Sequence, residues 1–153
     1  MNIILIIILS FIAAFCAGAI AVIDARRHII PDVYLFPMML CGLLLVGMDA
    51  LPWISGVLDA ALAAALGYGL GFVLKLVYDH MKHGQDTIGF GDIKLLAVGG
   101  IWLGTSGLSV AVITACVLGV VWAVIRKKRF VPFAPFFIVG MVGAIAWQLI
   151  INN

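Results

Sequence analysis

Two aspartates lie where a charged side chain is costly, at the ends of apolar segments. Asp24 directly follows AGAIAVI, residues 17–23, and Asp92 directly precedes IKLLAVGG, residues 93–100. An ionisable side chain beside membrane-embedded helix indicates a functional site by default. Two carboxylates that helix packing brings together can share one proton, so that one acts as general base toward water and the other as general acid. The pair therefore predicts the chemistry of an aspartic protease, with no cofactor and no metal ion.

Each aspartate also has a simpler explanation that must be weighed. Asp92 at a helix start is a favourable N-cap. Asp24 at a helix end meets the helix dipole with the wrong sign, so we expect contacts from elsewhere in the fold to hold it. In GFGD, residues 89–92, Gly89 and Gly91 let the backbone adopt a positive φ or let another segment approach closely. A G-x-G-D at a membrane-helix start, with a second acid at the same depth, favours a site over a cap.

The composition of the chain requires a lipid environment. Of its 153 residues, 65% are hydrophobic and 10% are charged, and the mean hydropathy is +1.27. A soluble domain of this length cannot hide so much apolar surface. The net charge of +2 is too small to indicate nucleic acid as a partner. We therefore predict an all-α integral membrane protein with one membrane-embedded domain over residues 1–153.

The apolar runs predict about six transmembrane helices, since a span needs about 20 residues, or somewhat fewer with snorkelling flanks. The predicted spans are 2–23, 33–48, 54–78, 93–104, 108–125 and 131–151. The fourth is the weakest because three glycines interrupt a short run. Pro135 lies just inside the sixth span and predicts a kinked or delayed helix start.

Positive charges predict the orientation of these spans. With six spans, all Lys and Arg residues fall on one side, whereas the opposite loops at 49–53 and 105–107 contain none. The basic residues are Arg26, Arg27, Lys75, Lys82, Lys94, Arg126, Lys127, Lys128 and Arg129. By the positive-inside rule the basic loops are cytoplasmic and both termini are outside. A cleaved signal peptide is the alternative for the first span, but no positive charge precedes it and two arginines follow it.

Two motifs make the sequence resemble the type IV prepilin peptidases, membrane aspartic proteases of the G-x-G-D type. The first is IDARRHIIPD, residues 23–32, and the second is GFGDIKLLAVGGIWLG, residues 89–104. The resemblance implies that Asp24 and Asp92 are the catalytic pair. It gives a shaping or supporting role to Asp32, Gly89, Gly91 and Lys94. It also implies a bacterial inner membrane location, membrane lipid as surroundings and prepilin or pseudopilin substrates, cut at the cytoplasmic face between a basic leader and an apolar helix.

One departure from this family bears on activity. Its larger members carry an N-terminal cytoplasmic region with C-x-x-C pairs and also methylate the new N-terminus. In this sequence the first apolar run begins at residue 2. We therefore expect peptidase activity alone, without methyltransferase activity.

Other functions and sites remain as alternatives. A small proton-coupled transporter would use the two aspartates as a proton relay, and a non-catalytic subunit of a pilus or secretion machine would use them as caps. His80 and His83, near Asp79 and Asp86, have a spacing that could bind a metal ion, but a solvated loop explains it more simply. The basic run at 126–129 is interpreted as an orientation anchor rather than a lipid-headgroup site.

Overall fold

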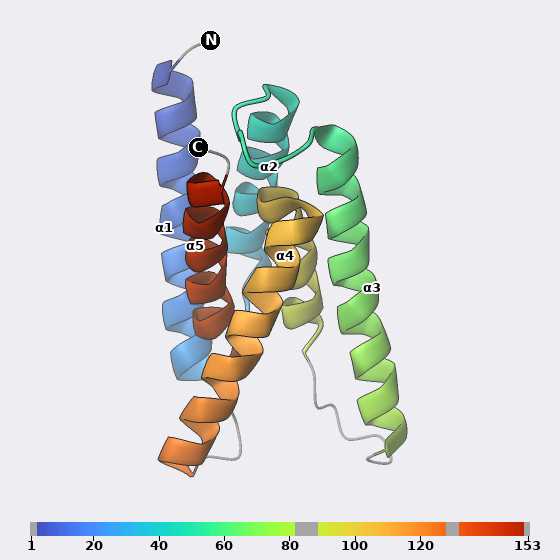
Figure 1. Cartoon of the computed structure of the whole chain (residues 1–153). Coiled ribbons are helices and arrows are strands. Elements are labelled where there is room, and N and C mark those ends of the chain that lie inside the picture. Colours follow the sequence, from blue (N-terminus) through green and yellow to red (C-terminus); the bar gives the residue numbers. More distant parts are fainter. Residues whose placement is uncertain (1–2, 82–88, 128–131, 152–153) are drawn as a thin grey trace.

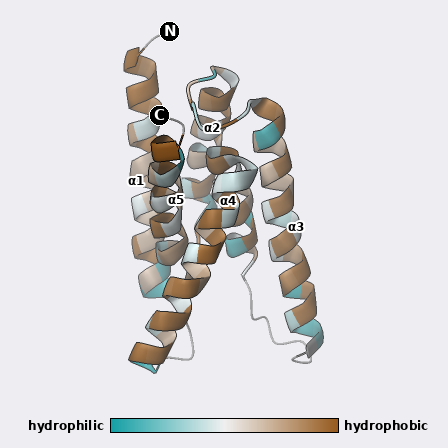
Figure 2. Ribbon diagram, viewed as in Figure 1, coloured by the Kyte–Doolittle hydropathy of each residue, from teal (hydrophilic) through white to brown (hydrophobic). Residues whose placement is uncertain are grey.

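The computed structural model describes residues 3–81, 89–127 and 132–151, and these form five helices without strands. The helices are α1 (Ile3–Arg27), α2 (Asp32–Gly47), α3 (Val57–Met81), α4 (Phe90–Arg126) and α5 (Phe133–Ile151). They form a bundle in which most residues are hydrophobic and the hydrophilic residues gather near helix ends (Figures 1 and 2), and many large hydrophobic side chains are exposed. The predicted all-α membrane protein is thus confirmed at the level of its fold class.

Four of the helices are long and apolar enough to cross a membrane. These are α1, α3, α4 and α5, whereas α2 is apolar but shorter, with 16 residues. The bounds of α2, α3 and α5 are close to those of the predicted spans. The first helix is longer than predicted and ends at Arg27. Alanine and arginine are good helix formers, and two arginines in the last turn complement the helix dipole there.

The two spans predicted at 93–104 and 108–125 belong to one interrupted helix, α4. Gly104 has φ 66° and ψ −177°, a conformation that only glycine adopts readily. Figure 1 shows the chain running toward one end of the bundle before this glycine and back again after it. We call residues 90–103 the first arm of α4 and residues 105–126 its second arm.

The predicted loop at 105–107 is wrong, because the second arm begins directly after Gly104. Asp59 of α3 makes this possible. Its Oδ1 accepts hydrogen bonds from the backbone N–H of Thr105 at 3.1 Å and from the Thr105 hydroxyl at 2.8 Å. At most helix starts, the side chain of the N-cap residue accepts such hydrogen bonds from the first backbone N–H groups. With the carboxylate supplied by α3, a single glycine suffices to reverse the chain.

Helix α4 is the centre of the packing. It contacts α3 and α5 extensively, while α1 packs against α2 and α5. The first arm approaches α3 so closely that a Cβ added at Gly67 would lie 2.5 Å from the carbonyl oxygen of Leu96. The lack of a side chain at Gly67 therefore lets the two helix backbones come this close. Helices α2 and α3 have few contacts with each other, whereas α4 contacts both of them. The first arm of α4 therefore lies behind the space between α2 and α3.

Candidate active site

Asp24 lies in the last turn of α1 and is buried, with 4% of its surface exposed. Its Oδ2 accepts a hydrogen bond of 2.9 Å from the backbone N–H of Ala134, in the first turn of α5. The positive end of the α5 dipole therefore faces this carboxylate. This confirms the expectation that contacts from elsewhere in the fold hold Asp24.

The sequence at the start of α5 explains why an aspartate of another helix caps it. Pro132 precedes the helix, and a proline has no side-chain oxygen with which to cap it. Asp24 supplies the missing acceptor from α1. Pro135 is the third residue of α5, where the backbone N–H that proline lacks would have no helical partner. The helix begins at Phe133, two residues after the start of the predicted span at 131.

Asp92 lies in the first turn of α4 and is half-buried. The N-cap of α4 is Gly89, and the backbone N–H of Asp92 donates to the Gly89 carbonyl at 3.1 Å. Asp92 is therefore the third residue of the helix rather than its cap. Its negative charge is still favourable there because it faces the positive end of the α4 dipole.

The segment that follows Asp24 packs against the turn that carries Asp92, because a Cβ added at Gly91 would meet Ile30. The two aspartates come from the last turn of α1 and the first turn of α4, and the first turn of α5 lies beside Asp24.

Asp32 and Lys94 form an ion pair between the two sequence motifs. The Lys94 ammonium donates to both carboxylate oxygens of Asp32, at 2.9 and 2.8 Å. Asp32 is the first residue of α2, and Lys94 lies two residues after Asp92 in α4. Their side chains are 67% and 46% exposed. The pair ties the start of α2 to the helix turn that carries Asp92.

Gly91 also joins the two motifs. A Cβ added at Gly91 would lie 2.8 Å from the Cβ of Ile30, in the segment between α1 and α2. The glycine is thus needed for close approach. The alternative reason, a positive φ, does not apply: Gly89 has φ −70°, and among the described glycines only Gly56 and Gly104 have positive φ. A Cβ at Gly89 would lie 3.4 Å from the Asp92 carboxylate and 3.9 Å from the backbone nitrogen of Gly91.

Sequence reasoning missed Lys75 as a neighbour of this region. Lys75 is buried in α3, forms an ion pair of 3.2 Å with Asp79, and lies 5.0 Å from the centre of the Phe90 ring. Phe90 is the first residue of α4, so these contacts steady the start of the helix that carries Asp92. One feature of the sequence could have indicated this role, namely a lysine within an apolar helix, four residues before an aspartate.

The remaining candidates lie only partly within the described residues. His80 is exposed near the end of α3, whereas His83 and Asp86, the other members of the possible metal group, lie outside the described residues. Arg126 stacks over the Trp122 ring at 4.8 Å. Lys128 and Arg129 of the same basic run also lie outside the described residues.

Comparison with known proteins adds an independent result. The family model described as "Type IV leader peptidase family" matches residues 3–124. Three similar proteins, each named "Prepilin leader peptidase/N-methyltransferase", come from Dickeya chrysanthemi, Escherichia coli (strain K12) and Neisseria gonorrhoeae. They are 36%, 30% and 33% identical to this chain over 70%, 84% and 74% of its length.

The matched regions are only parts of these relatives. They amount to 38%, 59% and 39% of the three proteins' own lengths, so the chain spans about half the length of the curated relatives that it matches. No solved structure matches the chain.

Proposed function

The chain belongs to the type IV leader peptidase family, and on this premise we propose that it is an aspartic endopeptidase that removes the basic leader from prepilin-like membrane proteins. One observation carries the proposal: Asp24 is buried and Asp92 half-buried, each in a turn at a helix end, and the segment that follows Asp24 packs against the turn that carries Asp92. The names of the relatives favour prepilins as the substrate class, and we include pseudopilins because the resemblance of the two motifs implies them.

The proposed reaction uses Asp24 and Asp92 as a general base and acid. One of the two is ionised and accepts a proton from a water molecule, whose oxygen bonds to the carbonyl carbon of the scissile peptide. The other is protonated and donates its proton to the carbonyl oxygen. When the C–N bond breaks, the leaving amine takes up a proton from one aspartic acid, and a hydroxyl of the tetrahedral intermediate gives its proton to the other aspartate as the new carboxyl group forms. The site thereby returns to one shared proton, and no cofactor takes part.

The other motif residues support this chemistry by placing the two aspartates. The Asp32–Lys94 ion pair and the close approach of Gly91 to Ile30 both connect the segment after Asp24 with the turn that carries Asp92. General acid–base catalysis depends on the position of each carboxylate to within a fraction of an ångström. We propose that these contacts set that position, with Gly89 leaving the Asp92 carboxylate unobstructed.

The proposed topology places the reaction at the cytoplasmic face of a bacterial inner membrane. If each arm of α4 crosses the bilayer and α2 does so too, the chain crosses six times and both termini are outside. Hydrophilic residues near the helix ends and the two arms of α4 support this arrangement. The cleavage site between a basic leader and an apolar helix would then lie at the depth of the two aspartates.

A cleavage assay tests the proposal. Purified protein in lipid vesicles is mixed with a panel of leader-bearing pilin-like proteins, and leader loss is followed by the mobility shift on a gel. We expect the parental protein to cleave at least one of them. Asp24→Asn and Asp92→Asn should each lose about 100-fold or more of the activity. Asp49→Asn, at an exposed acid in the turn after α2, is the matched control and should cleave normally.

The same assay separates the alternatives. Cleavage at the parental rate by either Asn variant would contradict the catalytic assignment. If no substrate is cleaved but the vesicles show proton flux that both variants lose, the transporter is correct. If neither activity is present, the assembly subunit is favoured.

Methylation of the product is a separate question, because the relatives' printed names include N-methyltransferase. We propose peptidase activity alone. The family model that matches is that of a leader peptidase. With S-adenosylmethionine present, mass spectrometry of the new N-terminus should find no added methyl group, and a methylated product would overturn this part of the proposal.

A further inference from the structure

A groove of about 430 Å³ lies between α2 and α3, with the first arm of α4 as its floor. The walls come from residues such as Leu35 and Met39 of α2 and Ala64 of α3, and the floor from Ala97 and Ile101. Phe36 and Tyr68 also line it and are 57% and 46% exposed. Because α2 and α3 touch little, the groove is open sideways, toward the surface that faces lipid in the proposed topology.

The polarity of this groove changes along its length. Its only charged lining residues are Asp32 and Lys94, the ion pair beside the turn that carries Asp92. The other lining residues are apolar or aromatic. From Lys94 to Ile101 the floor extends roughly 10 Å along the helix, at about 1.5 Å per residue. The groove is thus polar at the level of the two aspartates and apolar beyond it.

We propose that this groove receives the apolar helix of a membrane-inserted substrate, the segment that directly follows the scissile bond. The inference rests on the proposed peptidase function. A substrate cut where a polar leader meets an apolar helix has the same change of polarity at the same depth. Ala64 and Ala97 are small, so a second helix can come close to α3 and to the first arm. The groove is also continuous, through Lys94, with the helix turn that bears Asp92.

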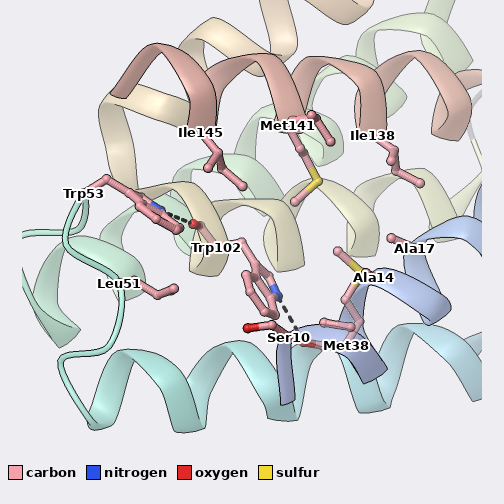
Figure 3. Close-up of a pocket in the computed structure, with 12 residues that line it drawn as sticks. Ser10, Ala14, Ala17, Met38, Leu51, Trp53, Trp102, Ile138, Met141 and Ile145 are labelled. Atoms are coloured by element: carbon pink, nitrogen blue, oxygen red, sulfur yellow. Dashed lines mark hydrogen bonds between the residues drawn. The ribbon is translucent and has the colours of Figure 1, made fainter. Parts of the chain in front are cut away.

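A second apolar pocket in the bundle is a poorer fit for such a segment. It has a volume of about 270 Å³ and is lined by residues of α1, α2, α4 and α5 and by Leu51 and Trp53. Figure 3 shows that the indole N–H of Trp53 donates a hydrogen bond to the backbone carbonyl of Trp102. The indole N–H of Trp102 in turn donates to the backbone carbonyl of Met38. None of its lining residues is charged or belongs to the GFGD or IDARRHIIPD segments. A substrate seated there would not meet the polar level of the site.

The first test places a photo-reactive amino acid at Phe36 or Tyr68, in the Asp92→Asn background so that the substrate is not consumed. The probe is a synthetic peptide with a lysine-rich leader, one glycine and about 20 leucine and alanine residues, inserted into vesicles with the protein. We expect both positions to cross-link to the apolar part of the peptide. Phe11, which is 74% exposed on α1 and outside the groove, is the matched position and should not cross-link.

A second test narrows the groove. Ala97→Phe should raise KM for the same peptide and lower kcat/KM roughly tenfold or more, with kcat retained at saturation. Ala61→Phe, at an exposed position on α3, and Ala17→Phe, in the pocket of Figure 3, should leave both constants near the parental values. The cross-links do not depend on Ala97→Phe being folded.

The outcomes distinguish this inference from the proposed function. If the parental protein cleaves the peptide but Phe36 and Tyr68 cross-link only lipid, or no more peptide than Phe11 does, the groove is not the substrate site and the peptidase stands. If the parental protein cleaves neither this peptide nor any pilin-like protein, the proposed function fails and the inference fails with it.

Discussion

The Lys94 ammonium donates hydrogen bonds to both carboxylate oxygens of Asp32, at 2.9 and 2.8 Å. This ion pair connects two sequence motifs that lie far apart in the chain. The pair lies at the polar end of the groove between α2 and α3 and two residues from Asp92. It therefore belongs both to the contacts that support the candidate site and to the groove proposed for the substrate helix. Because both side chains are about half exposed, the pair contributes little to the stability of the fold. Its effect on the position of Asp92 can therefore be measured separately.

Breaking this ion pair should alter cleavage more clearly than folding. Asp32→Asn or Lys94→Met should lower the free energy of unfolding by only about 0.2–1 kcal/mol, because exposed pairs are screened by solvent. We expect cleavage to fall several-fold, and the exchange Asp32→Lys with Lys94→Asp to restore part of it. Steady-state kinetics of the parental protein, Asp32→Asn, Lys94→Met and the double variant that carries both of these substitutions give the coupling energy. Lys127→Met, at an exposed lysine after α4, is the control, and additive effects in the double variant would contradict a functional pair.

Two substitutions of Asp24 should separate its catalytic role from its structural role. Asparagine keeps an oxygen that can accept the Ala134 N–H, whereas alanine leaves this buried donor unpaired, at a cost of about 1–3 kcal/mol. Asp24→Asn should therefore unfold at the parental temperature and Asp24→Ala at a lower one, with both inactive. Thermal unfolding in detergent measures the difference. Equal losses of stability would show that this hydrogen bond does not hold Asp24 in place.

A side chain at Gly91 should impair cleavage, because its Cβ would lie 2.8 Å from the Cβ of Ile30. Gly91→Val should be slower than the parental protein at equal protein level. Gly18→Val is the matched control, since no atom lies within 4 Å of a Cβ added there. Activity lost in Gly91→Ala should return when Ile30→Gly removes the opposing Cβ. Parental activity in Gly91→Val would contradict the close-approach argument.

The proposed topology predicts the side of the membrane on which each loop lies. A reporter enzyme fused after Lys82 should be active only in the cytoplasm, and one fused after Asp49 only outside. The reason is the distribution of Lys and Arg, all of which fall on one side when the chain crosses six times. Paired reporters of opposite preference at both positions make the measurement. An external signal after Lys82 would overturn the six-span arrangement.

The sequence predicted the helices well because the physical cause is local. Long apolar runs must form helices in lipid, where each backbone N–H and carbonyl needs a partner within the same segment. For that reason the bounds of α2, α3 and α5 are close to the predicted ones. The prediction failed at 105–107, where the turn depends on Asp59 from another helix. A contact between helices leaves no periodic signal in the residues around the turn.

By itself, the sequence established a membrane protein, the two acids at helix ends, and the family through two motifs in order. Only the tertiary structure decided what holds those acids: the α5 N-terminus at Asp24, and Gly89 rather than Asp92 as the cap of α4. It also decided that Lys94 pairs with Asp32 and that Gly91 serves close approach. Apolar patterning fixes each helix by itself, whereas the partners of a polar group depend on how helices distant in sequence pack together.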